Sequence, residues 1–541
     1  MKRILFVLLV CFVYSCTLFD KYEYTCNPRN KEYYDFVYID GDNFKIGDTV
    51  FFPLMVNYKV EPIKVGNEVV ISPARYYELP MLYEAKSKDS ILYQVEGHLQ
   101  MIKEMGFNTI RVCMDVVSKD GKGYYYYSDK PVYLRNDCND IIKAVDDFLN
   151  MAKSKGIRVM LLIKPPLDDE LMDFTISLLG AFSDNSTLFC YDFMNEPLYF
   201  DPQQDRKKED AFSVVSQWKD VMDKYAPHQL FTIGFSEPIE VFEWDPSILP
   251  VDFVQFHTYH PLRVPNEIWW YSHYVGKPWM IGETSFAVDN DSVGYEMQTY
   301  FMREVFQYAL NCGAAGFGWW EFQDSYNVHF EAEFSGLINH EGNTCTNDDK
   351  YSMVGTMKPA AYEVGKLKSY IPQKEWQAVN YYNMLGYNNV LLKGVVLEKG
   401  TNKPIEGAVV RGWNNDWSVG LNTYTNKEGV FTLYSNDVCT HFEISAPGMT
   451  KIKFDKELDY IFVDTVYTLD NLPNKKLEYH NISYKPFLIN DTLLLHFDST
   501  KFSLHKMCVF VFILKNPFTN FFIYYIINLN ISQLPIKEIL I

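Results

Sequence analysis

Two glutamates, each at the end of a short apolar run, are the residues best suited to chemistry in this chain. Glu196 ends the run 188–195, and Glu283 ends the run 278–282. Short apolar runs that stop at a polar residue and a turn predict buried strands of a parallel sheet. Two carboxyl groups that face each other across a barrel mouth can cleave a glycosidic bond. Glu196 and Glu283 are therefore the candidate catalytic pair.

The spacing of the two glutamates supports a barrel. A closed (β/α)8 barrel of about 250 residues is built from units of about 31 residues. Glu196 and Glu283 lie about three such units apart, so that if one ends the fourth strand, the other ends the seventh. The C-terminal ends of barrel strands form the face on which barrel enzymes carry their active sites.

The region 35–372 alternates between strand and helix patterns, as a closed barrel requires. No glycine-rich phosphate loop follows the first strand, which disfavours an open doubly wound sheet. A hairpin at 36–44 is expected to cap the barrel floor. Helical periodicity is clearest at 95–105, 141–155 and 211–225. The eight barrel strands are expected at 51–56, 109–114, 158–163, 188–195, 230–235, 251–257, 279–283 and 314–320.

The pattern changes after the barrel. Between 388 and 470, short alternating strands are separated by turns, which predicts a small all-β sandwich. The remaining tail, 471–541, holds an apolar stretch that Lys515 and Pro517 interrupt, so a membrane span is not expected there. The predicted fold class is thus α/β, a (β/α)8 TIM barrel followed by an all-β sandwich, and the tail has no assigned role.

The N-terminus has the layout of a secretory signal. Lys2 and Arg3 precede the apolar stretch 4–13, and the small residue Ser15 stands before Cys16. This arrangement resembles the lipobox of bacterial lipoproteins, in which the cysteine carries the lipid. We expect residues 1–16 to direct export and Cys16 to anchor the protein in a bacterial membrane, facing the periplasm or the cell surface. Simple secretion is the alternative.

Composition narrows the choice of partners. The chain has 69 acidic and 50 basic residues and a net charge of -19, which argues against nucleic acid and favours a neutral ligand. The ten cysteines show no CxxC or His/Cys spacing of a metal site, so neither a metal nor a cofactor is expected. A disulfide between Cys113 and Cys138 stays open. We expect a monomer.

Several motifs occur in order at barrel spacing. They are Asn195-Glu196-Pro197, His257-Thr258-Tyr259, Gly282-Glu283, the stretch 106–112 and the aromatic eighth strand. Over residues 36–370 the chain resembles clan A glycoside hydrolases, with family 5, in its cellulase and mannanase style, as the nearest match. The segment 388–470 resembles the carboxypeptidase regulatory-like domain through its stretches at 392–396, 405–410, 423–432 and 445–448.

The resemblance implies a retaining mechanism. This mechanism needs one protonated and one ionised carboxyl group about 5–5.5 Å apart. Glu196 matches the family's acid/base, and Glu283 matches its nucleophile. Arg111 matches the arginine beside the nucleophile, where a guanidinium would hold Glu283 ionised. The negative charge of Glu283 would in turn keep the proton on Glu196.

Four further positions match residues that bind substrate or support the pair. Asn195 matches the asparagine that hydrogen-bonds the sugar 2-hydroxyl, and Tyr259 would donate to the nucleophile. His257 would support the acid/base or the substrate. Trp320 matches the tryptophan under the sugar at the cleavage point. Strand alternation places Trp319 on the opposite face.

One departure concerns the third strand. Lys164 stands where family 5 members often carry a histidine, so we expect altered substrate recognition. The stretches 124–127 and 269–270 are expected in loops on the catalytic face, either as flanking subsites or as loop packing. In the sandwich, Trp413 and Trp417 are the aromatic residues that could contact carbohydrate.

The sequence therefore favours a lipid-anchored retaining β-glycosidase. Its expected substrate is a β-linked glycan such as mannan or glucan, and the expected mechanism is double displacement. The alternative is a catalytically retired barrel that only binds glycan at the cell surface. Which β-glycan is the substrate, and whether cleavage is endo or exo, stays open.

Overall fold

The computed structural model describes residues 35–74, 87–114, 116–117, 123–124, 138–167, 169–203, 205–288, 292–325, 334–369, 387, 389–455 and 464–472. These residues fall into two compact units, one that ends at residue 369 and one that runs from 387 to 472. The signal segment 1–16 with Cys16, and the tail beyond residue 472, lie outside the described residues. Among the described helices, none is long and apolar enough to cross a bilayer.

The first unit is a closed barrel of eight parallel strands, which confirms the predicted fold. Each strand pairs with the next along the chain, and the last pairs with the first through Trp319 and Val56, so the sheet has no open edge. Predicted and observed bounds agree within a few residues for seven of the eight strands. The strands are β4 (Leu54–Val65), β6 (Thr109–Met114), β9 (Arg158–Leu162), β10 (Leu188–Asn195), β11 (Leu230–Phe235), β12 (Val254–His257), β13 (Trp279–Glu283) and β14 (Gly316–Trp319).

The exception is the first strand, which was expected to stop at Asn57. Instead, β4 continues to Val65 and turns back into β5 (Glu68–Pro73) as an antiparallel hairpin. Asn57 does not end the strand because its amide finds acceptors inside the barrel, at Gly282 O (3.0 Å) and Trp319 O (3.1 Å). A satisfied buried amide can sit within a strand.

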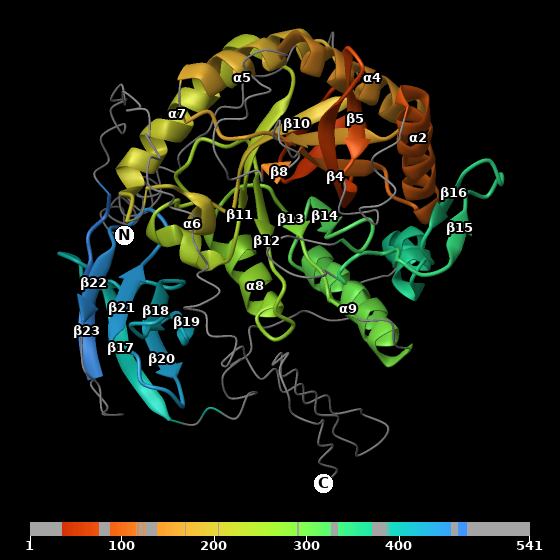
Figure 1. Cartoon of the computed structure of the whole chain (residues 1–541). Coiled ribbons are helices and arrows are strands. Elements are labelled where there is room, and N and C mark those ends of the chain that lie inside the picture. Colours follow the sequence, from red (N-terminus) through yellow and green to blue (C-terminus); the bar gives the residue numbers. More distant parts are fainter. Residues whose placement is uncertain are drawn as a thin grey trace, which may run out of the picture. The chain divides into compact units, whose positions relative to one another are not determined.

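Helices surround the barrel strands (Figure 1). The three helices expected from periodicity are present, each starting three to seven residues earlier than predicted. Four more, α5, α6, α8 and α9, were not located from sequence. The helices of this unit are α2 (Lys88–Met105), α4 (Cys138–Lys155), α5 (Asp169–Phe182), α6 (Pro197–Phe200), α7 (Lys208–Tyr225), α8 (Val264–Tyr274) and α9 (Ser292–Asn311), with 3-10 turns η3 (Pro238–Phe242), η4 (Pro359–Tyr362) and η5 (Val364–Ser369).

The loop prediction for Trp269 and Trp270 was wrong, because both lie in α8. Pro265 lies in the first turn of this helix. Ile268 and Tyr271 lie four and seven residues after Val264, and all three are buried. That spacing is the apolar face of a helix. Tyr125, Tyr126 and Tyr127 lie outside the described residues.

A small three-stranded sheet covers the barrel floor. It consists of β1 (Val37–Asp40), β2 (Asn43–Ile46) and β3 (Thr49–Val50). Its buried side chains Val37 and Phe44 form one apolar cluster with residues at the N-terminal ends of the barrel strands. Those residues are Met55, Met160, Phe189, Cys190, Leu230, Phe253, Met280 and Ala315. The hairpin thus closes the end of the barrel opposite the candidate site. The unit also contains two short hairpins, β7 (Val116–Val117) with β8 (Gly123–Tyr124) and β15 (Asn343–Cys345) with β16 (Ser352–Val354).

The second unit contains two sheets, in the orders β20-β17-β23 and β19-β18-β21-β22. Gly412 of β18 lies against Leu433 of β20, so the sheets pack face to face as a sandwich. Its strands are β17 (Val390–Glu398), β18 (Val409–Trp413), β19 (Gly420–Tyr424), β20 (Val430–Tyr434), β21 (His441–Ser445), β22 (Ile452–Asp455) and β23 (Asp464–Leu469).

Candidate active site

The two glutamates stand at the C-terminal ends of β10 and β13. Glu283 is the last residue of its strand, and its side chain is 5% exposed. Glu196 follows β10 directly and precedes the short helix α6, with φ at 40°. A non-glycine residue in this left-handed region is uncommon, and such residues cluster at functional sites. A carboxylate oxygen of Glu196 and one of Glu283 lie within 4.8 Å of each other.

Arg111 is the central cation of the site. It lies on β6, is fully buried, and donates from Nη1 to Oε1 of Glu283. Nη1 also donates to Asn57 Oδ1 (2.9 Å), Nε donates to Asp192 Oδ2 (2.9 Å), and Nη2 donates to Asn195 Oδ1 (2.8 Å). Burial alone would lower the pKa of the guanidinium, but the carboxylates of Asp192 and Glu283 outweigh burial and raise that pKa well above its ordinary value. Arg111 therefore carries a permanent positive charge, and its guanidinium group is fixed in position.

Glu283 is held from both sides. Arg111 donates to Oε1, and the hydroxyl of Tyr259 donates to Oε2. Tyr259 follows β12 and is the exposed member of this group, at 36%. The two donors fix both oxygens of the Glu283 carboxyl group in position. The arrangement aligns Glu283 for attack on a substrate in the barrel mouth.

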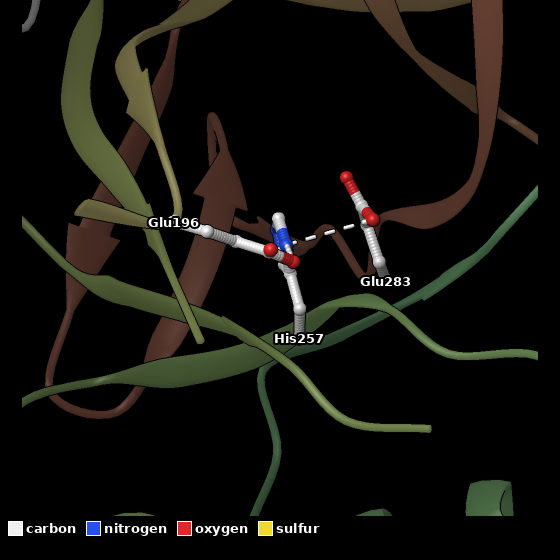
Figure 2. A group of neighbouring side chains, drawn as sticks. All are labelled: Glu196, His257 and Glu283. Atoms are coloured by element: carbon white, nitrogen blue, oxygen red, sulfur yellow. Dashed lines mark hydrogen bonds and ion pairs between the residues drawn. The ribbon is translucent and has the colours of Figure 1, made fainter. Parts of the chain in front are cut away.

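His257 bridges the two glutamates, as Figure 2 shows. Its Nδ1 lies 2.7 Å from Glu196 Oε1 and 3.5 Å from Glu283 Oε2. Burial lowers the pKa of His257 to about 4, so the imidazole is neutral at neutral pH. Nε2 faces Gly234, where an added Cβ would lie 2.9 Å from it. Only glycine leaves the room that this ring occupies.

Trp320 follows β14 and packs against Cys113 and Leu162 at the barrel mouth. The neighbouring Trp319 is fully buried and stacks edge-on with Phe301 of α9, on the outside of the barrel. Lys59 lies with Nζ 4.7 Å from the centre of the Trp320 ring. Of the two tryptophans, Trp320 is therefore the one that lines the mouth of the barrel.

Four polar residues of the site were not singled out from sequence. Asn57 and Asp192 contact Arg111, and Gln255 donates to Asp192 at 2.5 Å. Lys59 donates to Glu321 (3.1 Å) and Ser325 (2.9 Å) beside Trp320. Each of the four interrupts an apolar run at a position where the strand faces the barrel interior. This interruption is the signal that could have identified them.

Two other residues that the sequence singled out, Lys164 and Trp269, lie outside the hydrogen-bond network of Arg111 in the described contacts. Lys164 is half-buried at the end of β9. Trp269 stacks on His273 within α8, at 3.7 Å between ring centres. Cys113 does contact the network, because its Sγ accepts from Arg111 Nη1 at 3.7 Å; it is in no disulfide, so the bridge to Cys138 that the sequence left open is not formed.

Within the described residues, Glu196, His257 and Glu283 are the one group of side chains compact enough to test for a metal ion. The group fits an acid–base site better than a metal site. Both oxygens of Glu283 already accept hydrogen bonds, one from the Arg111 cation and one from Tyr259. A permanent cation at this distance opposes a second one. Two carboxyl groups and a neutral imidazole can instead transfer protons and attack an electrophilic carbon.

No protein-family model matches the chain, and no curated protein matches it. Among solved structures, it is similar to Bacteroides uniformis beta-glucuronidase 2, covalently bound to cyclophellitol-6-carboxylate aziridine (12% identity, TM-score 0.42). That alignment covers 80% of this chain and 48% of the glucuronidase, so the chain spans about half the length of that protein. It is also similar to a beta-glucosidase from Thermotoga maritima in complex with noeuromycin (11% identity, TM-score 0.41), over 59% of this chain and 97% of the glucosidase. Likeness at this level indicates neither family nor substrate.

Proposed function

We propose that this protein is a retaining β-glycosidase that hydrolyses a β-linked glycan by double displacement. One observation carries the proposal: carboxylate oxygens of Glu196 and Glu283 lie within 4.8 Å of each other at the barrel mouth. Retaining enzymes hold their two carboxyl groups about 5–5.5 Å apart, whereas inverting enzymes hold them about 6.5–9.5 Å apart to admit a water. The short separation of these oxygens supports the retaining arrangement.

In the first step, Glu283 attacks the anomeric carbon while Glu196 gives its proton to the glycosidic oxygen. The bond to the leaving sugar breaks, and a glycosyl ester of Glu283 forms with inversion. In the second step, Glu196 takes a proton from water, whose oxygen attacks the same carbon and releases Glu283. The second inversion restores the starting configuration, and Glu196 is again protonated.

The surrounding residues support these steps. Asn195 accepts from Arg111 through Oδ1, and we propose that its amide nitrogen donates to the sugar 2-hydroxyl. Trp320 offers an aromatic face for the apolar side of a pyranose. His257 is uncharged near neutral pH. It therefore forms a hydrogen bond with Glu196 but does not form an ion pair with that residue.

The substrate and the location are proposed on sequence grounds. The net charge of -19 favours a neutral glycan such as mannan or glucan. The signal at 1–16 and the lipid anchor at Cys16 would place the enzyme on a bacterial membrane, facing the periplasm or cell surface. The sandwich, with its resemblance to carboxypeptidase regulatory-like domains, would serve as a spacer or accessory module.

The decisive experiment separates the two glutamates. On an aryl β-glycoside with a good leaving group, Glu196→Ala should complete the first step, stall at the ester, and recover turnover when azide is added. The product should be the β-glycosyl azide. Glu283→Gln should lower kcat by orders of magnitude without rescue, since it removes the covalent nucleophile.

Glu363→Gln is the matched control, because Glu363 pairs with Arg303 away from the catalytic network. This variant should keep wild-type activity. An α-glycosyl azide would show an inverting couple. Glycan binding without hydrolysis by the wild-type protein, over a panel of β-glycans and aryl glycosides, would favour the retired barrel.

A further inference from the structure

Asp192 is a fully buried carboxylate with every oxygen engaged. Oδ2 accepts from Arg111 Nε at 2.9 Å and from Gln255 Nε2 at 2.5 Å. Oδ1 accepts from the backbone N–H groups of Gly234 (3.0 Å) and Met194 (3.4 Å). A buried carboxylate with four donors is fixed in position. It lies on the inward face of β10, four residues before Glu196.

Asp192 and Glu283 occupy different edges of one guanidinium. Asp192 contacts Nε and Nη2 of Arg111, and Glu283 contacts Nη1. The single positive charge of Arg111 is therefore shared between two carboxylates. If Glu283 were its lone counter-ion, the full attraction would stabilise the ionised nucleophile before reaction and oppose its attack.

In the proposed mechanism, the second counter-ion of Arg111 is needed most in the covalent intermediate. There Glu283 is an ester and carries no charge. Without a second carboxylate, Arg111 would then be an uncompensated buried cation, which is an expensive state. With Asp192 in place, the buried Arg111–Asp192 pair stays neutral before, during and after attack.

We propose that Asp192 is a positioning residue that acts through Arg111: it orients the guanidinium and balances its charge, so that Glu283 can lose its own charge when the glycosyl ester forms. This inference rests on the proposed retaining function. Asp192 touches neither Glu283 nor the substrate position in the described contacts. Its effect is therefore expected in the first chemical step and in the pH profile.

The test compares Asp192→Asn with Asp192→Glu on an activated aryl β-glycoside. Asp192→Asn removes the charge at nearly constant volume. At the effective dielectric of a protein interior, kcat/KM should fall about ten- to hundredfold and KM should change less. The acid limb of kcat/KM should move about one unit to lower pH, because Arg111 then favours the ionised nucleophile more strongly. Asp192→Glu keeps the charge, so its acid limb should stay in place even if kcat falls.

The groups that face Glu283 are Arg111, Tyr259, His257 and Glu196, from β6, β10 and β12. His257 also titrates in acid, but the Asp192 charge raises its pKa too. Removal of that charge therefore moves both groups in the same direction, and the predicted sign of the limb shift does not depend on which of them controls it.

Asp245→Asn is the matched control. Asp245 is equally buried and pairs with Lys208 at 2.8 Å, outside the Arg111 network. It should lower stability and leave the acid limb unchanged. A folded Asp192→Asn with an unshifted limb overturns the inference. If Asp192→Asn does not fold, a limb that moves in Asp192→Glu overturns it, and an unmoved limb supports it. If wild-type protein hydrolyses no glycoside, the proposed function has failed instead.

Discussion

Glu240 is a buried acid whose protonation should set the alkaline stability of the barrel. It lies in η3 and accepts a hydrogen bond from α6, the short helix that follows Glu196. Oε1 accepts from the N–H and hydroxyl of Ser236 (3.1 and 2.8 Å) and from the N–H of Leu198 in α6 (3.1 Å). Burial, which outweighs these hydrogen bonds, raises the pKa of Glu240 from 4.5 to about 8.

The size of the effect follows from linkage. Because the folded pKa is raised, the folded state keeps a proton that the unfolded state releases above pH 4.5. The stabilisation is fully present below pH 4.5 and is lost as pH rises to about 8. At about 1.4 kcal/mol per pH unit, the free energy of unfolding should fall on the order of 4 kcal/mol across this window.

Glu240→Gln removes this titration and keeps the acceptor at Oε1. The amide nitrogen would replace Oε2, which has no hydrogen-bond partner in the described part of the chain, so a constant cost of about 1–2 kcal/mol is expected at all pH values. Urea unfolding of both proteins at pH 5, 6.5, 8 and 9 measures the difference. The wild-type curve should decline and the Glu240→Gln curve should be flatter. Parallel curves would refute the reasoning, because they would mean that Glu240 ionises alike in both states.

Two further outcomes follow from the site. The pKa of His257 is lowered to about 4, so its contribution to stability is present above its ordinary value of 6.5 and is lost as pH falls through 4. As pH falls, kcat/KM should accordingly show no loss centred near pH 6.5, and an acid limb centred there would contradict a neutral imidazole. Lys59→Met leaves the fully buried Glu321 without its cation and should cost about 3–5 kcal/mol in urea unfolding. The double variant with Glu321→Gln should recover much of that loss, and strictly additive losses would show that the pair is not coupled.

The barrel could be predicted because its strands differ sharply in composition from their surroundings. Seven strand positions follow directly from apolar runs that end in polar residues. The same rule failed at Asn57, because it treats a polar residue as the end of burial. Inside a closed barrel, a polar residue can be satisfied by carbonyls of strands that are distant in sequence, here those of Gly282 and Trp319.

The supporting residues of the site were harder to find for a related reason. Glu196 and Glu283 carry recognisable neighbours along the chain. Asp192 meets Arg111, and Gln255 meets Asp192, only through strand register, since residues from β6, β10 and β12 must first be set side by side. A sequence pattern shows that such a residue is unusual but does not show which other residue it contacts.

The close approach at Gly234 has a consequence for chains related to this one. A single methyl group there would lie 2.9 Å from His257 Nε2 and 3.1 Å from Arg111 Nη2, so it would displace the bridging ring and the central cation together. Loss of activity in such a barrel would then need no change to either glutamate. The two glutamates alone therefore do not identify an active barrel of this type. The glycine at position 234 is required as well, because no larger side chain leaves room for His257 and Arg111.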